Sequence, residues 1–99
     1  MSNSSVIVMT AAKAKPGREQ ELHRALRDVA QAARRQAGCV DYRIFRSAED
    51  VGATLNVEQW TSEEERNASL AGPEVETFIA AVSDIFAGAP EPISYQEID

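Results

Sequence analysis

The order of strand-like and helix-like segments is the feature that most restricts how this chain can fold. Four short runs of β-branched and aromatic residues are interleaved with two regions whose apolar residues recur every three or four positions. Their order along the chain is strand, helix, strand, strand, helix, strand, and a Gly-Pro pair at residues 72–73 divides the second helical region. This order predicts one antiparallel sheet of four strands with helices packed on it. The expected strands are residues 6–11, 40–46, 54–60 and 93–98, and the expected helices are residues 18–35, 61–70 and 73–87.

Capping residues support these helix boundaries. Gly38 follows the first helical pattern, where a left-handed backbone conformation would end the helix. The next helical pattern opens with two overlapping capping boxes, Thr61 with Glu64 or Ser62 with Glu65. The sequence does not distinguish between the two capping boxes, so it predicts the first residue of this helix to within one position.

Both faces of the expected sheet carry apolar side chains. In the first strand Val6 and Val8 alternate with Ile7 and Met9, and successive side chains of a strand point to opposite faces. The helices of a ferredoxin-like βαββαβ fold cover only one face of its antiparallel four-stranded sheet. We therefore expect an α+β, ferredoxin-like chain whose second face is covered by another copy, in a face-to-face homodimer.

Length and composition are those of one small globular domain. Ninety-nine residues, 43% of them hydrophobic, suffice for a single modest core. We expect residues 1–5 to be disordered and residues 6–99 to form the domain. No apolar run is long enough to span a membrane, no secretory signal pattern opens the chain, and a single cysteine cannot form an internal disulfide. These observations predict a reduced, cytoplasmic protein without a membrane partner.

Charge is distributed unevenly along the chain. The net charge of −6 argues against a nucleic-acid partner, whose phosphates are bound by basic residues. Residues 1–47 carry nine basic and four acidic groups, whereas residues 63–99 carry one basic and nine acidic groups. Because the expected topology places these segments side by side, we interpret the asymmetry as charge complementarity within the protein or across a dimer.

The inventory of metal-binding and nucleophilic residues is small. The chain has one histidine, His23, and one cysteine, Cys39, so it lacks the residues of a His/Cys zinc site or a Ser-His-Asp triad. His23 falls outside the apolar stripe of its helix, which predicts a surface position. We expect no metal site and interpret Cys39 as a small buried apolar residue.

Three unusual side chains share one face of the expected third strand. Asn56, Glu58 and Trp60 lie two residues apart and therefore point the same way. A buried amide or carboxylate without partners costs about 1–3 kcal/mol, so these residues indicate a hydrogen-bonded network or a pocket with polar contents. Alternatives stay open: Trp60 as plain core packing, and Glu58 as the partner of an arginine. Tyr42 on the neighbouring strand either packs in the core or points into the same cavity.

Three segments resemble the antibiotic biosynthesis monooxygenase (ABM) domain family, in the family's order and spacing. They are Lys-Pro-Gly-Arg-Glu at residues 15–19, Gly-Cys-Val-Asp-Tyr-Arg-Ile-Phe-Arg at residues 38–46, and Val-Glu-Gln-Trp at residues 57–60, before a helix start rich in Ser and Glu. The resemblance extends over nearly the whole chain. It implies an ABM-type domain over residues 6–99 that assembles as a dimeric α+β barrel.

The resemblance also implies site residues. Family members that oxidise polycyclic aromatic compounds to quinones without metal or flavin carry an Asn and a Trp four residues apart on the third strand, and Asn56 and Trp60 match this pair. By this resemblance Asn56 and Trp60 are the candidate catalytic residues, and Tyr42 and Glu58 are candidate substrate-binding residues that help to move a proton. No cofactor is implied beyond O₂ as co-substrate. Haem-degrading relatives ligate iron through a histidine after the Trp, and this sequence has no histidine after His23.

The leading functional hypothesis is a cofactor-independent monooxygenase that oxidises an aromatic or quinol-like small molecule with O₂. One alternative is an isomerase, or other chemistry without oxygen, on a small phosphorylated metabolite. Another alternative is a non-catalytic domain of the same fold that binds a small molecule, because a fold does not determine a function. The basic residues that would hold a phosphorylated ligand are Lys13, Lys15, Arg43 and Arg46.

Overall fold

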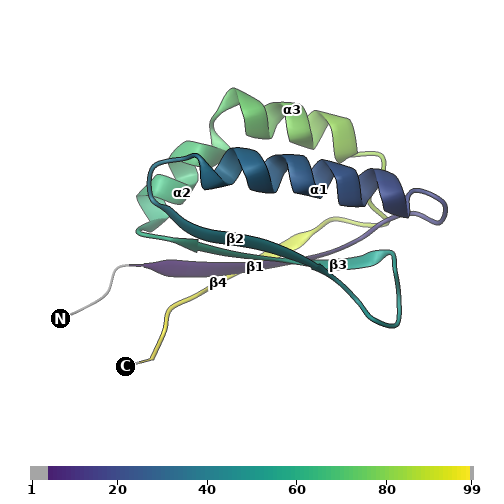
Figure 1. Ribbon diagram of the computed structural model, residues 1–99, viewed down its shortest axis with the longest axis horizontal. Helices are drawn as coiled ribbons and strands as arrows, with labels where there is room; N and C mark the ends of the chain where they lie inside the picture. The colour runs from purple at the N-terminus through teal and green to yellow at the C-terminus, as the bar shows by residue number, and fades with distance from the viewer. Residues whose placement is uncertain (1–4, 99) are drawn as a thin grey trace.

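Four strands form one antiparallel sheet, and three helices lie on one side of it (Figure 1). The computed structural model describes residues 5–98, so most of the segment expected to be disordered, residues 1–5, lies outside the described residues. The strand order across the sheet is β2-β3-β1-β4, which confirms the ferredoxin-like βαββαβ prediction. The elements are β1 (Val6–Lys13), α1 (Glu19–Arg34), β2 (Cys39–Arg46), β3 (Ala53–Trp60), α2 (Glu63–Leu70), α3 (Pro73–Val82) and β4 (Glu91–Tyr95).

Two boundaries near the C-terminus differ from the sequence prediction. Helix α3 ends at Val82, four residues before Phe86, because the following backbone bonds to the end of β1: the amide of Lys15 donates to the Ile85 carbonyl, and the amide of Ala87 donates to the Lys13 carbonyl. The last strand covers residues 91–95 instead of 93–98, since β4 pairs with β1 from Glu91 to Tyr95. In both places the apolar pattern of the sequence continues beyond the observed end of the element. Backbone hydrogen bonds with β1 and the residues after it set the observed ends.

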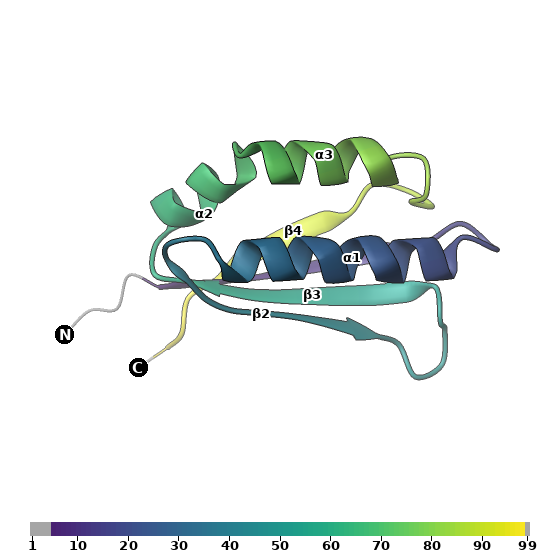
Figure 2. The same ribbon diagram turned by 45° about the horizontal axis from the view of Figure 1, so that its top comes forward.

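The helices lie over one side of the sheet (Figure 2), and that side holds the core. Val6 and Val8 of β1 are buried there, as are the even-numbered residues of β3 from Thr54 to Trp60. Helix α1 presents the predicted apolar stripe to this side. The core therefore lies between the sheet and α1, α3 and the segment after α3. Its other buried apolar members are Ala14, Leu22, Leu26, Val29, Ala30, Ala33, Tyr42, Val82 and Ile85.

The opposite face of the sheet is apolar and uncovered by any element of the described chain. Cross-strand pairing places Ile93 beside Met9, and Phe45 beside Leu55, on this open face. These four side chains and Tyr95 are between 36% and 52% exposed. Apolar residues therefore occupy both faces, as the alternation in β1 predicts, and one of the two faces has no cover within a single chain.

The N-terminus of α2 uses one of the two predicted capping boxes. The Ser62 hydroxyl accepts a hydrogen bond from the amide of Glu65 at 3.1 Å, and helix α2 begins at Glu63. The segment before α2 is held to the turn between α1 and β2, because the Thr61 amide donates to the Gly38 carbonyl at 2.8 Å. Gly38 has the predicted left-handed backbone, with a φ of +86°, but it does not cap α1, because the C-cap residue is Arg35 in a right-handed helical conformation. Gly38 lies instead in the turn before β2, in which the Cys39 amide donates to the Gln36 carbonyl at 3.2 Å.

We expect Gly38→Ala to destabilise the protein more than Gly17→Ala. Both glycines have a positive φ, which costs an L-residue about 1–2 kcal/mol. A Cβ at Gly38 would also lie 2.6 Å from side-chain carbons of Glu65, whereas a Cβ at Gly17 would meet nothing within 4 Å. Thermal unfolding should show Tm lowered by roughly 5–10 °C in Gly38→Ala, with partial recovery on adding Glu65→Ala. Equal losses at the two glycines would show that Glu65 moves aside without cost.

Opposite charges meet between the helices. Arg35, after the end of α1, lies 3.3 Å from the Glu74 carboxylate at the start of α3, and Arg18 lies 3.8 Å from Asp84 beyond the end of α3. These pairs are largely exposed to solvent, so each contributes little to stability. They support the interpretation of the uneven charge as complementarity within one chain. Within residues 5–98, no helix is long and apolar enough to cross a membrane.

Candidate active site

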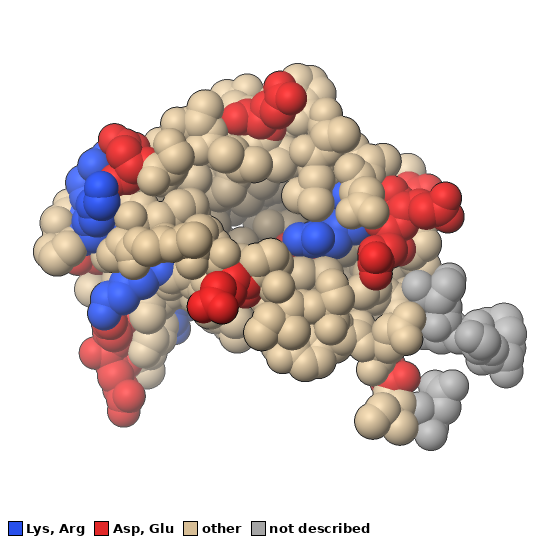
Figure 3. All heavy atoms as spheres, turned by 180° about the vertical axis from the view of Figure 1, so that it is seen from behind, with Lys and Arg blue, Asp and Glu red and all other residues tan. Residues whose placement is uncertain are grey.

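A cavity of about 650 Å³ lies between the sheet and the helices. This volume is within the range of small-molecule sites, about 300–1,000 Å³. Its mouth is visible as a hollow near the middle of the face shown in Figure 3, with acidic and basic groups at the rim. The lining is mainly apolar. The apolar side chains that line it from the helices and the segment after α3 include Leu26, Val29, Ala33, Leu70, Val75, Phe78, Ile79 and Phe86.

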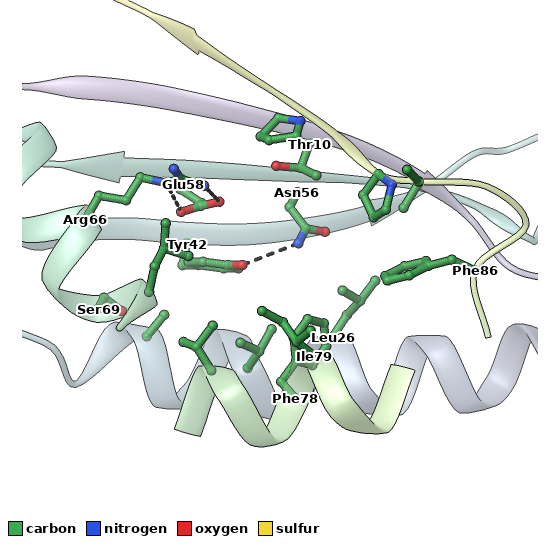
Figure 4. Close-up of a pocket in the computed structure, with 18 of the residues that line it drawn as sticks. Thr10, Leu26, Tyr42, Asn56, Glu58, Arg66, Ser69, Phe78, Ile79 and Phe86 are labelled. Carbon is green, nitrogen blue, oxygen red and sulfur yellow. Dashed lines mark hydrogen bonds and ion pairs between the residues drawn. The ribbon is translucent and has the colours of Figure 1, made fainter. Parts of the chain in front are cut away.

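The polar part of the lining comes mainly from the sheet, opposite this apolar wall (Figure 4). Asn56, Glu58 and Trp60 are alternate residues of β3, and Tyr42 of β2 is the cross-strand partner of Glu58. All four line the cavity, and each is less than 10% exposed. The structure therefore brings the four sequence-predicted site residues to one place, while their chemical roles stay predictions.

Tyr42 and Asn56 form a buried hydrogen-bonded pair. The Asn56 Nδ2 donates to the Tyr42 Oη at 3.3 Å, so the phenol proton is directed elsewhere. Burial, and after it the negative charge of Glu58, raise the pKa of the Tyr42 phenol well above its usual range. Tyr42 is therefore a hydrogen-bond donor at neutral pH and not a base. Arg34 of α1 holds this part of the edge strand by donating to the Tyr42 carbonyl from Nε at 3.0 Å and Nη2 at 2.6 Å.

Glu58 is at the centre of the second polar group. Its Oε1 accepts hydrogen bonds from the Trp60 Nε1 at 2.9 Å and the Arg66 Nε at 3.1 Å, and its Oε2 accepts a longer bond from the Arg66 Nη2 at 3.5 Å. Both interpretations of Glu58 left open by the sequence are therefore met, because it pairs with an arginine and also lines the cavity. Trp60 is only 1% exposed, so its indole is core and its N–H holds the carboxylate.

Arg66 is the lining residue that sequence reasoning missed. It lies on α2, outside the strand pattern that selected Asn56, Glu58 and Trp60. A signal was present, since Arg66 is the one basic residue in the acidic segment 63–99. Ser69 of α2, buried at 8% exposure, and Thr10 of β1 also line the cavity.

The other candidate groups lie away from this cavity. His23 is half-buried, and its Nε2 is 3.0 Å from the Val51 carbonyl. Burial and the charge of Glu58 raise the pKa of the Cys39 thiol, which is not among the residues that line the cavity. In the part of the chain that the structure describes, no group of three or more His, Cys, Asp or Glu side chains is placed to hold a metal ion. The cavity lining also contains none of the basic residues proposed for a phosphorylated ligand, which are Lys13, Lys15, Arg43 and Arg46.

Comparison with known proteins agrees with this fold. The sequence model of the family described as antibiotic biosynthesis monooxygenase matches residues 5–81. No curated protein matches the chain.

Solved structures with the same fold come from several bacteria. A Nitrosomonas europaea protein that carries the family's name has a TM-score of 0.93 at 17% identity, covering 99% of this chain and 94% of that one. Rv0793 from Mycobacterium tuberculosis has a TM-score of 0.90 at 20% identity, with 97% of each chain covered. A Chloroflexus aurantiacus protein, also carrying the family's name, has a TM-score of 0.84 at 26% identity over 97% of this chain and 95% of that one.

Proposed function

Because the chain belongs to the antibiotic biosynthesis monooxygenase family, we propose that it is a monooxygenase that oxidises an aromatic, quinol-like small molecule with O₂. The observation that carries the proposal is the pair of donors, Asn56 and Tyr42, buried in the wall of an otherwise apolar cavity. An aromatic ring fits such a cavity, and a negative oxygen that develops on the ring is stabilised by fixed donors in a site of low dielectric constant.

The chemistry proposed for this site needs an electron-rich substrate. Loss of a proton from an anthrone or a phenol gives an anion, which passes one electron to O₂. The resulting radical pair combines to a hydroperoxide on carbon. At a CH₂ group, as in an anthrone, loss of water then leaves a carbonyl, so that one oxygen atom of O₂ enters the product and the other leaves as water. The protein has to hold the ring, stabilise the anion and exclude water.

Each polar group of the cavity has a place in this proposal. Asn56 Nδ2 and the Tyr42 hydroxyl donate hydrogen bonds to the substrate oxygen on which negative charge develops. Glu58 is the acceptor beside them and receives the substrate proton, since Tyr42 keeps its own. Trp60 positions Glu58 through its indole N–H and is a positioning residue in this proposal.

We propose no metal, haem or flavin for the reaction. The described residues that line the cavity include no histidine, cysteine or methionine, which are the usual protein ligands of haem iron apart from tyrosine. The tyrosine that is present, Tyr42, holds a proton and bonds to Asn56. The electrons for O₂ come from the substrate itself.

The test is O₂ consumption with a panel of anthrones, naphthols and hydroquinones, followed by mass spectrometry of the product formed under ¹⁸O₂. Incorporation of one ¹⁸O atom into the new carbonyl of the anthrone and naphthol products is the expected result, whereas a hydroquinone already carries both oxygens and serves in the panel as a substrate for O₂ uptake only. Binding of panel members without any O₂ uptake would replace this proposal with the non-catalytic binding domain. A shift in Tm with sugar phosphates and none with aromatics would favour the phosphorylated ligand instead.

We also propose that the working form is a homodimer joined through the open face of the sheet. Met9, Leu55 and Ile93 are exposed on this face, and the Arg43 guanidinium carbon lies 5.1 Å from the centre of the Phe45 ring. A contiguous apolar sheet face is typical of an interaction surface. A two-fold axis through it would pair the same residues from both copies.

The raised pKa of Tyr42 predicts a loss of stability at alkaline pH. Above pH 10 the unfolded chain releases the phenol proton while the folded protein keeps it, so the stabilisation present below pH 10 falls as the pH rises towards the folded pKa. Urea unfolding from pH 8 to 11 should show a difference between wild type and Tyr42→Phe that shrinks by up to about 1.4 kcal/mol per pH unit. Tyr95→Phe, at a half-exposed position of β4, is the matched control. A constant difference would show that Tyr42 ionises as freely as in the unfolded chain.

A further inference from the structure

The polar groups of the cavity form two separate subsites along β3. Figure 4 shows Asn56 with the Tyr42 hydroxyl as one subsite, and Glu58 with Arg66 as the other, towards one end of the cavity. Asn56 and Glu58 are two residues apart on the same face of the strand, which separates their Cα atoms by about 6–7 Å. This spacing is close to the width of a six-membered ring with an oxygen at each end.

The second subsite has unused hydrogen-bonding capacity. A guanidinium carries five N–H groups, and Glu58 receives bonds from Nε and Nη2 only, which leaves three without a partner among the described residues. No buried side-chain nitrogen or oxygen of the described residues lacks a partner, so the unpartnered Arg66 Nη1, which carries two of these three N–H groups, reaches accessible space. Arg66 lines the cavity with its side chain 14% exposed.

Glu58 also has room for another donor. Its Oε1 already accepts two hydrogen bonds, whereas Oε2 accepts one at 3.5 Å, which is at the long limit for such a bond. Arg66 as donor and Glu58 Oε2 as acceptor lie side by side. A single hydroxyl group can satisfy both, because its oxygen accepts from the guanidinium while its proton is donated to the carboxylate.

We infer that Arg66 is a specificity-determining residue, which with Glu58 binds a second oxygen function on the ring, across from the oxygen held by Asn56 and Tyr42. This inference rests on the proposed function only in taking the cavity as the ligand site. The ion pair is electrically neutral as a unit, so it favours a hydroxyl over a carboxylate or a phosphate. The preferred ligand is an aromatic compound with two oxygens at opposite positions of one ring.

The helix that carries Arg66 adds a reason why this residue selects ligands. Within residues 5–98, Arg66 is the one α2 residue whose side chain forms hydrogen bonds with the polar wall made by β2 and β3. Its bidentate geometry with a carboxylate holds the guanidinium plane in one orientation. Lysine at the same place would keep the charge, but it has three N–H donors instead of five and lacks the planar fork.

The test measures binding in the absence of O₂, by calorimetry, with 1-naphthol and 1,4-dihydroxynaphthalene. The two probes differ by one hydroxyl at the opposite position of the ring. We expect the wild type to bind the dihydroxy compound about tenfold more tightly, as for a hydrogen bond to a charged group. Arg66→Lys should reduce this preference to about threefold or less, while the affinity for 1-naphthol changes by less than about twofold.

Two further variants control for folding and charge. Removing Arg66 alone would leave Glu58 buried without its partner, so the double variant Glu58→Gln/Arg66→Gln replaces the ion pair with two neutral groups of similar size, and it should lose the preference with Tm retained. Arg35→Gln removes a surface arginine paired with Glu74 and should keep the tenfold preference. A preference that persists in Arg66→Lys and in the double variant would overturn the inference. Failure of both naphthols to bind the wild type would overturn the choice of this cavity as the ligand site, and with it the proposed function.

Discussion

Asn56→Ala should lower the rate of O₂ consumption at least about tenfold, the order expected for loss of one donor to a developing oxyanion. Asn56 is 8% exposed in the cavity wall, and its amide bonds to Tyr42 at 3.3 Å. Removing the amide deletes one donor and frees the Tyr42 hydroxyl to rotate. Asn56→Asp keeps the size of the side chain but replaces the donor with a negative charge, so it should lower the rate further. The measurement is the initial rate of O₂ uptake with the best substrate of the aromatic panel.

The matched control for this prediction is Asn67→Ala. Asn67 is exposed on α2 and does not line the cavity, so the same change in side chain should leave the rate within about twofold of the wild type. Thermal unfolding of each variant separates loss of chemistry from loss of folded protein. Equal rates in wild type, Asn56→Ala and Asn56→Asp would remove Asn56 from the mechanism.

Leu55→Arg should convert the proposed dimer into a monomer. Leu55 lies on the open face of central strand β3, beside Phe45 and Ala11 of the flanking strands. A two-fold interface contains each residue twice, so one substitution buries two unpaired charges. Loss of a central apolar residue weakens such an interface by about 2 kcal/mol or more. Because the substitution is present in both copies, the dissociation constant should rise roughly a thousandfold. Sedimentation velocity should show a wild-type dimer and a variant near the 10.8 kDa of one chain.

Val51→Arg is the control for this second prediction. Val51 is 51% exposed in the loop between β2 and β3, so it tests the same substitution outside the strands of the open face. Circular dichroism should show the same helix content in both variants, because Leu55 does not belong to the core. A wild type that sediments as a monomer at micromolar concentration would contradict the dimer, and an unchanged dissociation constant in Leu55→Arg would place the interface elsewhere.

The sequence was sufficient to predict those candidate site residues that share one strand. Asn56, Glu58 and Trp60 were selected by a spacing of two, and the structure places all three in the cavity wall. Arg66 could not be selected in this way, since it is eight residues from Glu58 and on another element. Its contact with Glu58 depends on the direction in which the chain leaves β3 and on how α2 packs, which no local pattern contains.

The same limit explains the error at the end of α3. The apolar spacing of Ile85 and Phe86 continues the pattern of α3, and Ile85 is indeed buried at 3% exposure. Its backbone nevertheless bonds to Lys15, after β1. A buried apolar residue satisfies the periodicity whether it lies on a helix or beside a strand, so the pattern alone could not distinguish the two.

The sequence by itself determined the order of the elements, the two-faced apolar sheet and the common direction of Asn56, Glu58 and Trp60. These features follow from side-chain periodicity within one element, which depends on residues a few positions apart. Only the tertiary structure decided that a cavity of about 650 Å³ lies between the sheet and the helices, that the Asn56 amide donates to the Tyr42 hydroxyl, and that Arg66 completes the polar wall. The physical reason is that the distance and direction between packed elements are set by the combined shapes of many side chains, and hydrogen bonds between elements form only after that packing is established.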